Sequence, residues 1–315
     1  MQRAATWGVV LLAAAACGGG GGDDGGGAGG TGELPYCERS YTDRLDAVCQ
    51  AWNCAMRDPP TPAWTGSAGT CDPGDDPALR GAALDLTNAY RFLAGLAPVT
   101  VDETNATRAQ ACALLQHANR ALSHDPPDDW ACFTQDGRLG AGGSNIATAD
   151  AWDAVHMFLV DDGANNADRL GHRRWILSPA LERVGFGTTD AYACMWVVHP
   201  FELAEQAFVA WPPPGPVPAA VVHGARPQVA GSLDLVGWSI QSNRIDFSRA
   251  TVHVTEDGKE VPVRIQVLGP NTGSRYALKI VPDGWRTAIG STYAVHVDGV
   301  SEPIAYEFEL VDCRG

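Results

Sequence analysis

The sequence has little positive charge, and no basic stretch in it is longer than Arg173-Arg174. Its 22 Lys and Arg face 37 Asp and Glu, which gives a formal net charge of −15. Proteins bind nucleic acids and anionic membrane surfaces through a basic patch. The charge balance therefore argues against nucleic acid as a partner and against attraction to an anionic lipid surface.

No membrane-spanning length is present in the apolar run WGVVLLAAAA at residues 7–16, which is too short to cross a bilayer. The run follows the single positive charge of Arg3 and ends in small residues, as an export signal does. The small residues at 14–16 followed by Cys17 resemble a bacterial lipoprotein signal, in which the cysteine is lipidated and becomes the mature N-terminus. Ordinary secretion, with cleavage after an Ala-x-Ala site, is the alternative.

A Gly-rich segment follows at residues 18–33, and its composition cannot pack into a core. With residues 1–17 as the lipoprotein signal, this segment is expected to be a flexible tether. The acidic pair Asp23-Asp24 lies away from the lipidated end. The expected position is therefore the outer membrane or the cell surface, with the membrane contacted through the lipid anchor on Cys17.

CxxC pairs are absent, so nothing indicates a zinc ribbon. Apart from Cys17, eight cysteines remain, and four of them fall within residues 37–71. An even number of cysteines in an exported chain indicates disulfides. Their pairing does not follow from the sequence.

The order of elements predicts an α+β domain over residues 78–211. The Cys-rich segment before it, residues 34–77, has too few apolar residues for a core of its own and is expected to pack on this domain. Helical periodicity predicts three helices, followed by short strands. The expected helices cover 79–93, about 102–124 and 146–160, a loop lies at 128–145, and the expected strands cover 171–177 and 193–198. Helices followed by strands without regular alternation are typical of an α+β fold.

The run WPPPGPVP ends this domain and has the composition of a linker, which we place at residues 212–218. Beyond it, alternating apolar and polar residues recur between Gly, Pro and Asp clusters, and Asp257-Gly258 marks a hairpin. This pattern predicts an all-β Ig-like sandwich over residues 219–315. No internal repeat relates it to the preceding domain.

Several ordered motifs between residues 79 and 200 resemble the CAP superfamily, also called SCP-like, which includes cysteine-rich secretory and pathogenesis-related proteins. The motifs are Asn88 with Arg91, Ser123-His124, GGSNIA at 142–147, GHRRWIL at 171–177, VGFG at 184–187 and ACMWVV at 193–198. The resemblance implies a CAP-type α-β-α sandwich with a central cleft.

In this family two histidines and two acids often line the cleft and can hold a divalent ion such as zinc. Carried over, the two histidines are His124 and His172. The acid at the end of the third helix falls on Asp161, and the adjacent Asp162 is a nearly equal choice. The acid of the family's Gly-Glu-Asn loop falls on Ser144, so that carboxylate is missing.

Two functions compete for these residues. His124, His172 and Asp161 would form an open zinc site whose bound water could attack a substrate, as in a divalent-metal-dependent hydrolase or peptidase. Such chemistry needs a general base, and the hydroxyl of Ser144 cannot take a proton at neutral pH unless another group activates it. Ser144 is therefore a possible catalytic residue only where another group activates its hydroxyl. His117, two turns before His124 on the same helix face, is a rival cleft histidine.

The leading hypothesis is an exported, surface-tethered protein that binds a ligand without catalysis. The resemblance suggests a lipid or sterol, a glycan or a protein as the ligand, and the expected binding residues are His124, Ser144, Asn145 and His172. The C-terminal sandwich would be an accessory recognition module or a spacer. A purely structural envelope protein is the third possibility.

Overall fold

The computed structural model describes residues 43–57, 59–163, 165–200, 206–224 and 231–313. The expected export signal, the lipidated Cys17 and the Gly-rich tether lie outside the described residues. Among the described helices, none combines the length and the apolar character needed to cross a membrane.

The described helices begin where the sequence supplies caps. Asp43, Asp76, Asp102 and Asp150 each accept a backbone N–H bond at the start of a helix, and such caps stabilise helix starts. The expected helices near 79–93 and 102–124 are confirmed, although the second ends at Asn119. The helices are α1 (Arg44–Ala55), α2 (Pro77–Leu93), α3 (Glu103–Asn119), α4 (Gln135–Gly143), α5 (Ala151–Val160), α6 (Gly171–Ile176), α7 (Ala219–His223) and α8 (Leu233–Val236).

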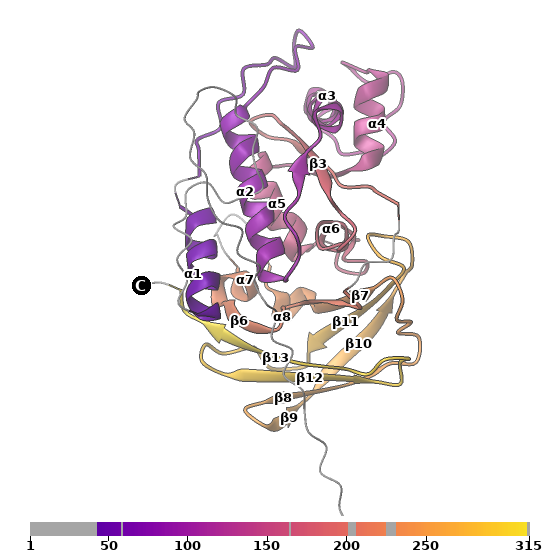
Figure 1. Ribbon diagram of the computed structural model, residues 1–315. Helices are drawn as coiled ribbons and strands as arrows, with labels where there is room; N and C mark the ends of the chain where they lie inside the picture. Colours follow the sequence, from indigo (N-terminus) through magenta and orange to yellow (C-terminus); the bar gives the residue numbers. More distant parts are fainter. Residues whose placement is uncertain (1–42, 58, 164, 201–205, 225–230, 314–315) are drawn as a thin grey trace, which may run out of the picture.

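The N-terminal sheet lies between two layers of helices. Its strands are β1 (Thr100–Val101), β2 (Ser144–Ala147), β3 (Arg183–Thr188) and β4 (Ala193–Trp196), in the order β1-β3-β4-β2. Helices α3 and α4 lie on one side of β3, and α2 and α5 lie on the other (Figure 1). The predicted α+β class and the α-β-α arrangement are confirmed, and β2 forms an edge of the sheet.

Three local assignments were wrong in this region. The GHRRWIL stretch is helix α6 and not a strand, because a short apolar run has no periodicity that separates the two. The third helix begins at Ala151, since Ser144–Ala147 pairs with β4 as a strand. The expected loop at 128–145 contains α4, which Thr134 caps through its hydroxyl.

The C-terminal part consists of two sheets, as expected for a sandwich. The strands are β5 (Val209–Trp211), β6 (Gly215–Pro218), β7 (Trp238–Ser242), β8 (Thr251–Glu256), β9 (Lys259–Val261), β10 (Val263–Leu268), β11 (Tyr276–Pro282), β12 (Thr292–Asp298) and β13 (Ile304–Val311). One sheet has the order β10-β11-β7-β5 and the other β6-β13-β12-β8-β9. The predicted hairpin at Asp257-Gly258 joins β8 to β9.

The proline-rich run does not serve as a linker. Strand β5, which ends at Trp211, pairs with β7, and β6 pairs in parallel with β13. Proline is tolerated at the edge of a sheet because its missing N–H can face away from the neighbouring strand. Residues 209–218 therefore supply an edge strand to each sheet of the sandwich.

Three disulfides join pairs of described cysteines. Cys49–Cys313 links α1 to the end of the C-terminal part, Cys71–Cys132 links the Cys-rich segment to the loop before α4, and Cys112–Cys194 links α3 to β4. The prediction of disulfides is confirmed, and disulfides of this number are consistent with an exported protein. Helix α1 packs against α2 and β6, so the Cys-rich segment contacts the neighbouring domain as expected.

A single hydrophobic core joins the N-terminal and C-terminal parts. It includes Val48 of α1, Phe158 of α5, Trp238 of β7 and Leu310 of β13. At the junction, the rings of Tyr90 and Trp211 meet edge to face with centroids 5.7 Å apart. The sandwich therefore packs directly against the α-β-α unit, below it in Figure 1.

Candidate functional site

His172 lies in the first turn of α6 and bonds to a buried carboxylate. Its Nδ1 lies 2.9 Å from Oδ1 of Asp161, whose side chain has no exposed surface. Because a carboxylate accepts, Nδ1 donates, and in the neutral ring Nε2 then keeps its lone pair. The side chain of His172 is 18% exposed, so Nε2 belongs to a side chain that solvent or a ligand can reach.

Asp161 takes this position because it ends α5. It adopts a left-handed conformation (φ 59°), and its N–H bonds to the carbonyl of Met157. Aspartate tolerates this conformation better than most residues. Its second carboxylate oxygen accepts the backbone N–H of Arg173 at 3.2 Å. Asp161, and not Asp162, is thus the acid that contacts His172; burial and the neighbouring charge of Asp161 raise the pKa of Asp162.

His124 is held from the opposite side of the sheet. It follows α3, its residue is exposed, and its Nδ1 donates to the carbonyl of Ala141 in α4 at 2.9 Å. Its Nε2 is therefore also the acceptor nitrogen. The rival histidine, His117, is packed between the rings of Trp64 and Tyr192, with Asp190 3.5 Å from its Nδ1.

Side chains of strand β2 contact the surroundings of both histidines. Asn145 donates from Nδ2 to the carbonyl of His172 at 3.1 Å. Ile146 packs with Ala141 and Cys112 on the side of α3 and α4. Because strand residues alternate, Ser144 lies on that same side, which also holds His124.

Ser144 is the site residue that lacks a protein partner. It is 4% exposed, and its Oγ is buried without a hydrogen bond to any described group. Buried hydroxyls in native proteins are normally bonded to protein, water or ligand. Ser144 on the edge strand β2 therefore holds a hydroxyl without the bond that buried hydroxyls normally have. We call His124, Ser144, Asn145, Asp161 and His172 the histidine site.

The metal-ligand set of His124, His172 and Asp161 stays a prediction. Nowhere among the described residues do three His, Cys, Asp or Glu side chains gather in a way that could hold a metal ion. Asp161 is engaged by His172 and Arg173 and orients the imidazole from behind. Metal-binding histidines commonly have such a carboxylate or a carbonyl on the other ring nitrogen. Only the two Nε2 atoms therefore fit a ligand role, and a divalent ion stays a prediction.

Three buried arginines, Arg91, Arg173 and Arg174, stabilise α6, and their structural role was not foreseen from the sequence. Arg173 donates to the carbonyls of Leu159 and Val160, and Arg91 donates from α2 to the carbonyls of Ile176 and Ser178. Burial lowers the pKa of Arg91 and of Arg173 to about 10, so both remain charged at neutral pH. An arginine pair inside an otherwise apolar run was the available signal, because charged groups are buried only when bonded.

The arrangement also explains two motif residues of helix α2. Asn88 bonds the backbone N–H and C=O of Val99 through its amide. Arg91 reaches the end of α6 and the carbonyl of Leu181. Asn88 thus fixes the backbone before β1, at the other edge of the sheet from β2, whereas Arg91 fixes the end of the helix that carries His172.

Comparison with protein families gives a match over residues 84–199, to the model described as CAP, the cysteine-rich secretory protein family. The comparison with curated proteins found no match, and the comparison with solved structures found none. The matched segment runs from within α2 to beyond β4 and includes every residue of the histidine site.

Proposed function

Since residues 84–199 place this chain in the CAP family, we propose that it is an exported protein that binds a ligand at the histidine site without catalysis. The observation that carries the proposal is the buried hydroxyl of Ser144, which has no protein partner. It stands where the family's acid is expected, so a hydrogen-bonding group replaces a charged one. The ligand is a lipid or sterol, a glycan or a protein that presents a polar group to this edge.

Two imidazoles complete the proposed contact surface. Nδ1 of each ring is occupied, by Asp161 in one case and by Ala141 in the other. Both Nε2 atoms can then accept a hydrogen bond from a ligand hydroxyl or amide. The Asn145 amide keeps His172 at this edge through its carbonyl. Export and the lipid anchor on Cys17 remain part of the proposal, and they would expose the site to extracellular ligands.

Ser144→Ala tests the ligand contact with little risk to the fold. Because the hydroxyl bonds to no described protein group, its removal should leave the free energy of unfolding unchanged or slightly increased. The full-length protein, purified from its native membrane fraction, should lose co-purifying ligand by about tenfold in quantitative mass spectrometry of the extract, as expected for one lost hydrogen bond of about 1.4 kcal/mol.

His253→Ala is the matched control for a parallel His172→Ala variant. His253 lies on β8 with its side chain 58% exposed and bonds to Glu260. We expect His172→Ala to lose ligand and His253→Ala to retain it. An extract without any enriched lipid, glycan or protein in the wild type, together with normal function of a His124→Ala, His172→Ala double variant, would favour the structural envelope role instead.

A metal-dependent hydrolase is the second candidate, and the Asp161–His172 pair favours it. A carboxylate that orients an imidazole is a common arrangement for general bases and for metal ligands. Here the bond to Asp161 holds the proton on Nδ1, which leaves Nε2 of the neutral His172 ring as a metal ligand. Metal analysis of the wild type against His172→Ala decides this case. Zinc bound by the wild type and lost in the variant supports it, whereas equal and negligible zinc in both contradicts it.

A further inference from the structure

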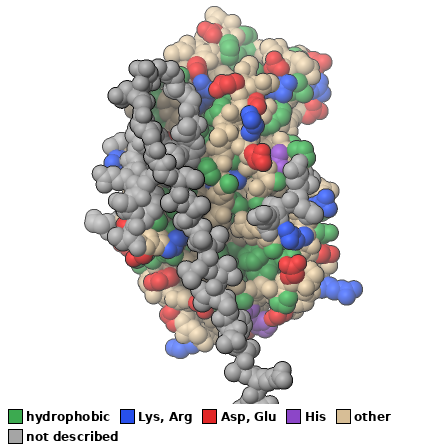
Figure 2. Space-filling model, in the orientation of Figure 1, with side chains coloured by type: hydrophobic (Ala, Val, Ile, Leu, Met, Phe, Trp, Pro, Cys, Tyr) green, Lys and Arg blue, Asp and Glu red, His purple; other side chains and the backbone are tan. Residues whose placement is uncertain are grey.

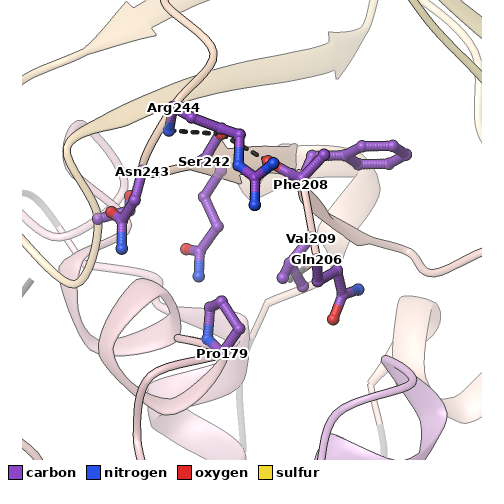
Figure 3. A pocket seen from close by; sticks show the side chains of 10 residues that line it. Pro179, Gln206, Phe208, Val209, Ser242, Asn243 and Arg244 are labelled. Carbon is purple, nitrogen blue, oxygen red and sulfur yellow. Dashed lines mark hydrogen bonds between the residues drawn. The ribbon is translucent and has the colours of Figure 1, made fainter. Parts of the chain in front are cut away.

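Helix α6 lies against the sandwich, and a small pocket marks the junction. The pocket lies among Pro179, Phe208, Gln241, Ser242 and Arg244 (Figure 3). Its volume of about 10 Å³ is at the lower limit for one water molecule. The pocket is too small for a ligand. Two of the side chains that line it, Gln241 and Ser274, however, bond to α6.

The sandwich bonds to the two arginines of α6. Arg173 donates from Nη1 to the carbonyl of Gly237 at 2.8 Å and to the hydroxyl of Ser239 at 3.3 Å. Arg174 donates to the hydroxyl and the carbonyl of Ser274 at 3.1 and 3.0 Å. Both arginines are at most 1% exposed. Charged donors in such surroundings are held firmly, because an unmet bond would cost the full desolvation of the group.

Gln241 of β7 holds the other end of the helix. Its Nε2 donates to the carbonyls of Arg174 and Leu177 at 3.1 and 2.8 Å. Carbonyls in the last turn of a helix lack partners within the helix. The sandwich therefore supplies bonds that α6, with six residues, cannot supply for itself.

The loop between β10 and β11 also touches the backbone of α6. Gly273 adopts φ +68°, and a Cβ there would lie 2.2 Å from the carbonyl carbon of Arg174. At the start of the helix, a Cβ on Gly171 would lie 2.8 Å from Cγ2 of Thr272. The distance between the loop and the helix is thus fixed by close contact at two points.

We propose that the C-terminal sandwich sets the orientation of His172, with Gln241, Ser239 and Ser274 as positioning residues. The link is short: Arg173 carries both the bonds to the sandwich and the backbone N–H that binds Asp161, the acceptor of the His172 ring. The sandwich is then a structural part of the histidine site and not a separate spacer. The inference rests on the proposed function of that site, but its test needs no ligand.

The test records the ring nitrogens of His172 by NMR in the full-length protein with labelled histidine. Wild type should show Nδ1 protonated and Nε2 bare, and Asp161→Asn should move both signals. Gln241→Leu and Ser274→Ala should move the Nε2 signal of His172 part of the way toward its position in Asp161→Asn. The ring of His124, which is held locally by Ala141, should stay in place and serves as an internal control.

Ser248→Ala is the matched control, because Ser248 is an exposed residue of the sandwich outside these contacts. It should leave both histidine rings unchanged. If Gln241→Leu does not fold, Ser239→Ala and Ser274→Ala provide milder variants with the same expected direction. Sandwich variants whose His172 signals coincide with the wild type, while Asp161→Asn differs, would overturn the proposal. Absence of any ligand would overturn the proposed function but not this result.

Discussion

His124 and His172 both donate a hydrogen bond from Nδ1. The two rings differ greatly in how many groups hold them and in how deeply those groups are buried. The partner of His124 is a backbone carbonyl in the adjacent helix, 17 residues away, and the residue is exposed. His172 rests on a fully buried carboxylate and on a helix bonded to α2, α5 and the sandwich. The ring of His124 is thus held by a contact that is close in sequence and lies near the surface. The ring of His172 depends on buried contacts with α2, α5 and the sandwich.

This contrast suggests how the site can adapt to a ligand. A side chain held by one local bond can rotate at small cost, whereas one held by a buried network cannot. The face in Figure 2 carries acidic and basic side chains interspersed among apolar and other groups. Because the two rings differ in bonding, we expect the ring of His172 to stay in place when a ligand binds and the ring of His124 to rotate. The following predictions test the contrast through stability.

The largest effect is expected for Arg173→Ala. The substitution removes a buried charge near Asp161 and leaves the carbonyls of Leu159, Val160 and Gly237 without their donor. The free energy of unfolding should therefore fall by about 3 kcal/mol or more. Arg138→Ala is the counterpart near His124, since Arg138 forms exposed ion pairs with Asp125 and Asp128. It should cost less than about 1 kcal/mol. Denaturant unfolding of both variants measures the difference, and equal losses would remove the contrast.

A smaller effect is expected from adding one methyl group to each region. Gly273→Ala requires a left-handed alanine against the backbone of α6 and should cost about 2 kcal/mol. Gly142→Ala places its Cβ 3.5 Å from the carbonyl oxygen of His124, an ordinary contact, within α4. It should stabilise the protein by about 0.5 kcal/mol, because alanine favours the helix. Thermal unfolding checks both signs, and a stabilising Gly273→Ala would show that the loop does not press on α6.

The sequence was sufficient for elements that local periodicity determines and insufficient for helix α6, which carries His172. The helices near 79–93 and 102–124 and the alternating strands of the sandwich depend on neighbours in sequence, and these predictions held. The GHRRWIL stretch was assigned as a strand because its apolar residues alone cannot distinguish a short helix. What makes it helical is its bonding to Gln241 and Ser274, more than 60 residues away. The edge strand β6 was missed for the same reason, since its pairing with β13 is long-range.

The smallest change in the free energy of unfolding is expected at Asp85, a partly buried carboxylate that, unlike the arginines of α6, is not held by hydrogen bonds to described residues. Asp85 on α2 is half-buried, and its carboxylate makes no hydrogen bond or ion pair with a described residue. Burial raises the pKa of this carboxyl from 3.8 to about 6. A raised carboxyl pKa means that the folded state holds the proton more tightly than the unfolded state. The resulting penalty is absent below pH 3.8, grows as the pH rises, and is complete above about pH 6.

Asp85→Asn should therefore stabilise the protein at pH 8, by about 1 kcal/mol once solvent screening of this partly exposed group is considered. At pH 4 the variant and the wild type should differ little, because the wild-type carboxyl is then largely protonated in the folded state. Asp129→Asn, at an exposed position without an ion pair to a described residue, is the control and should show no such pH dependence. Denaturant unfolding at both pH values measures the effect. Equal stabilisation at pH 4 and pH 8 would mean that packing, and not the buried charge, distinguishes Asp85 from the arginines of α6.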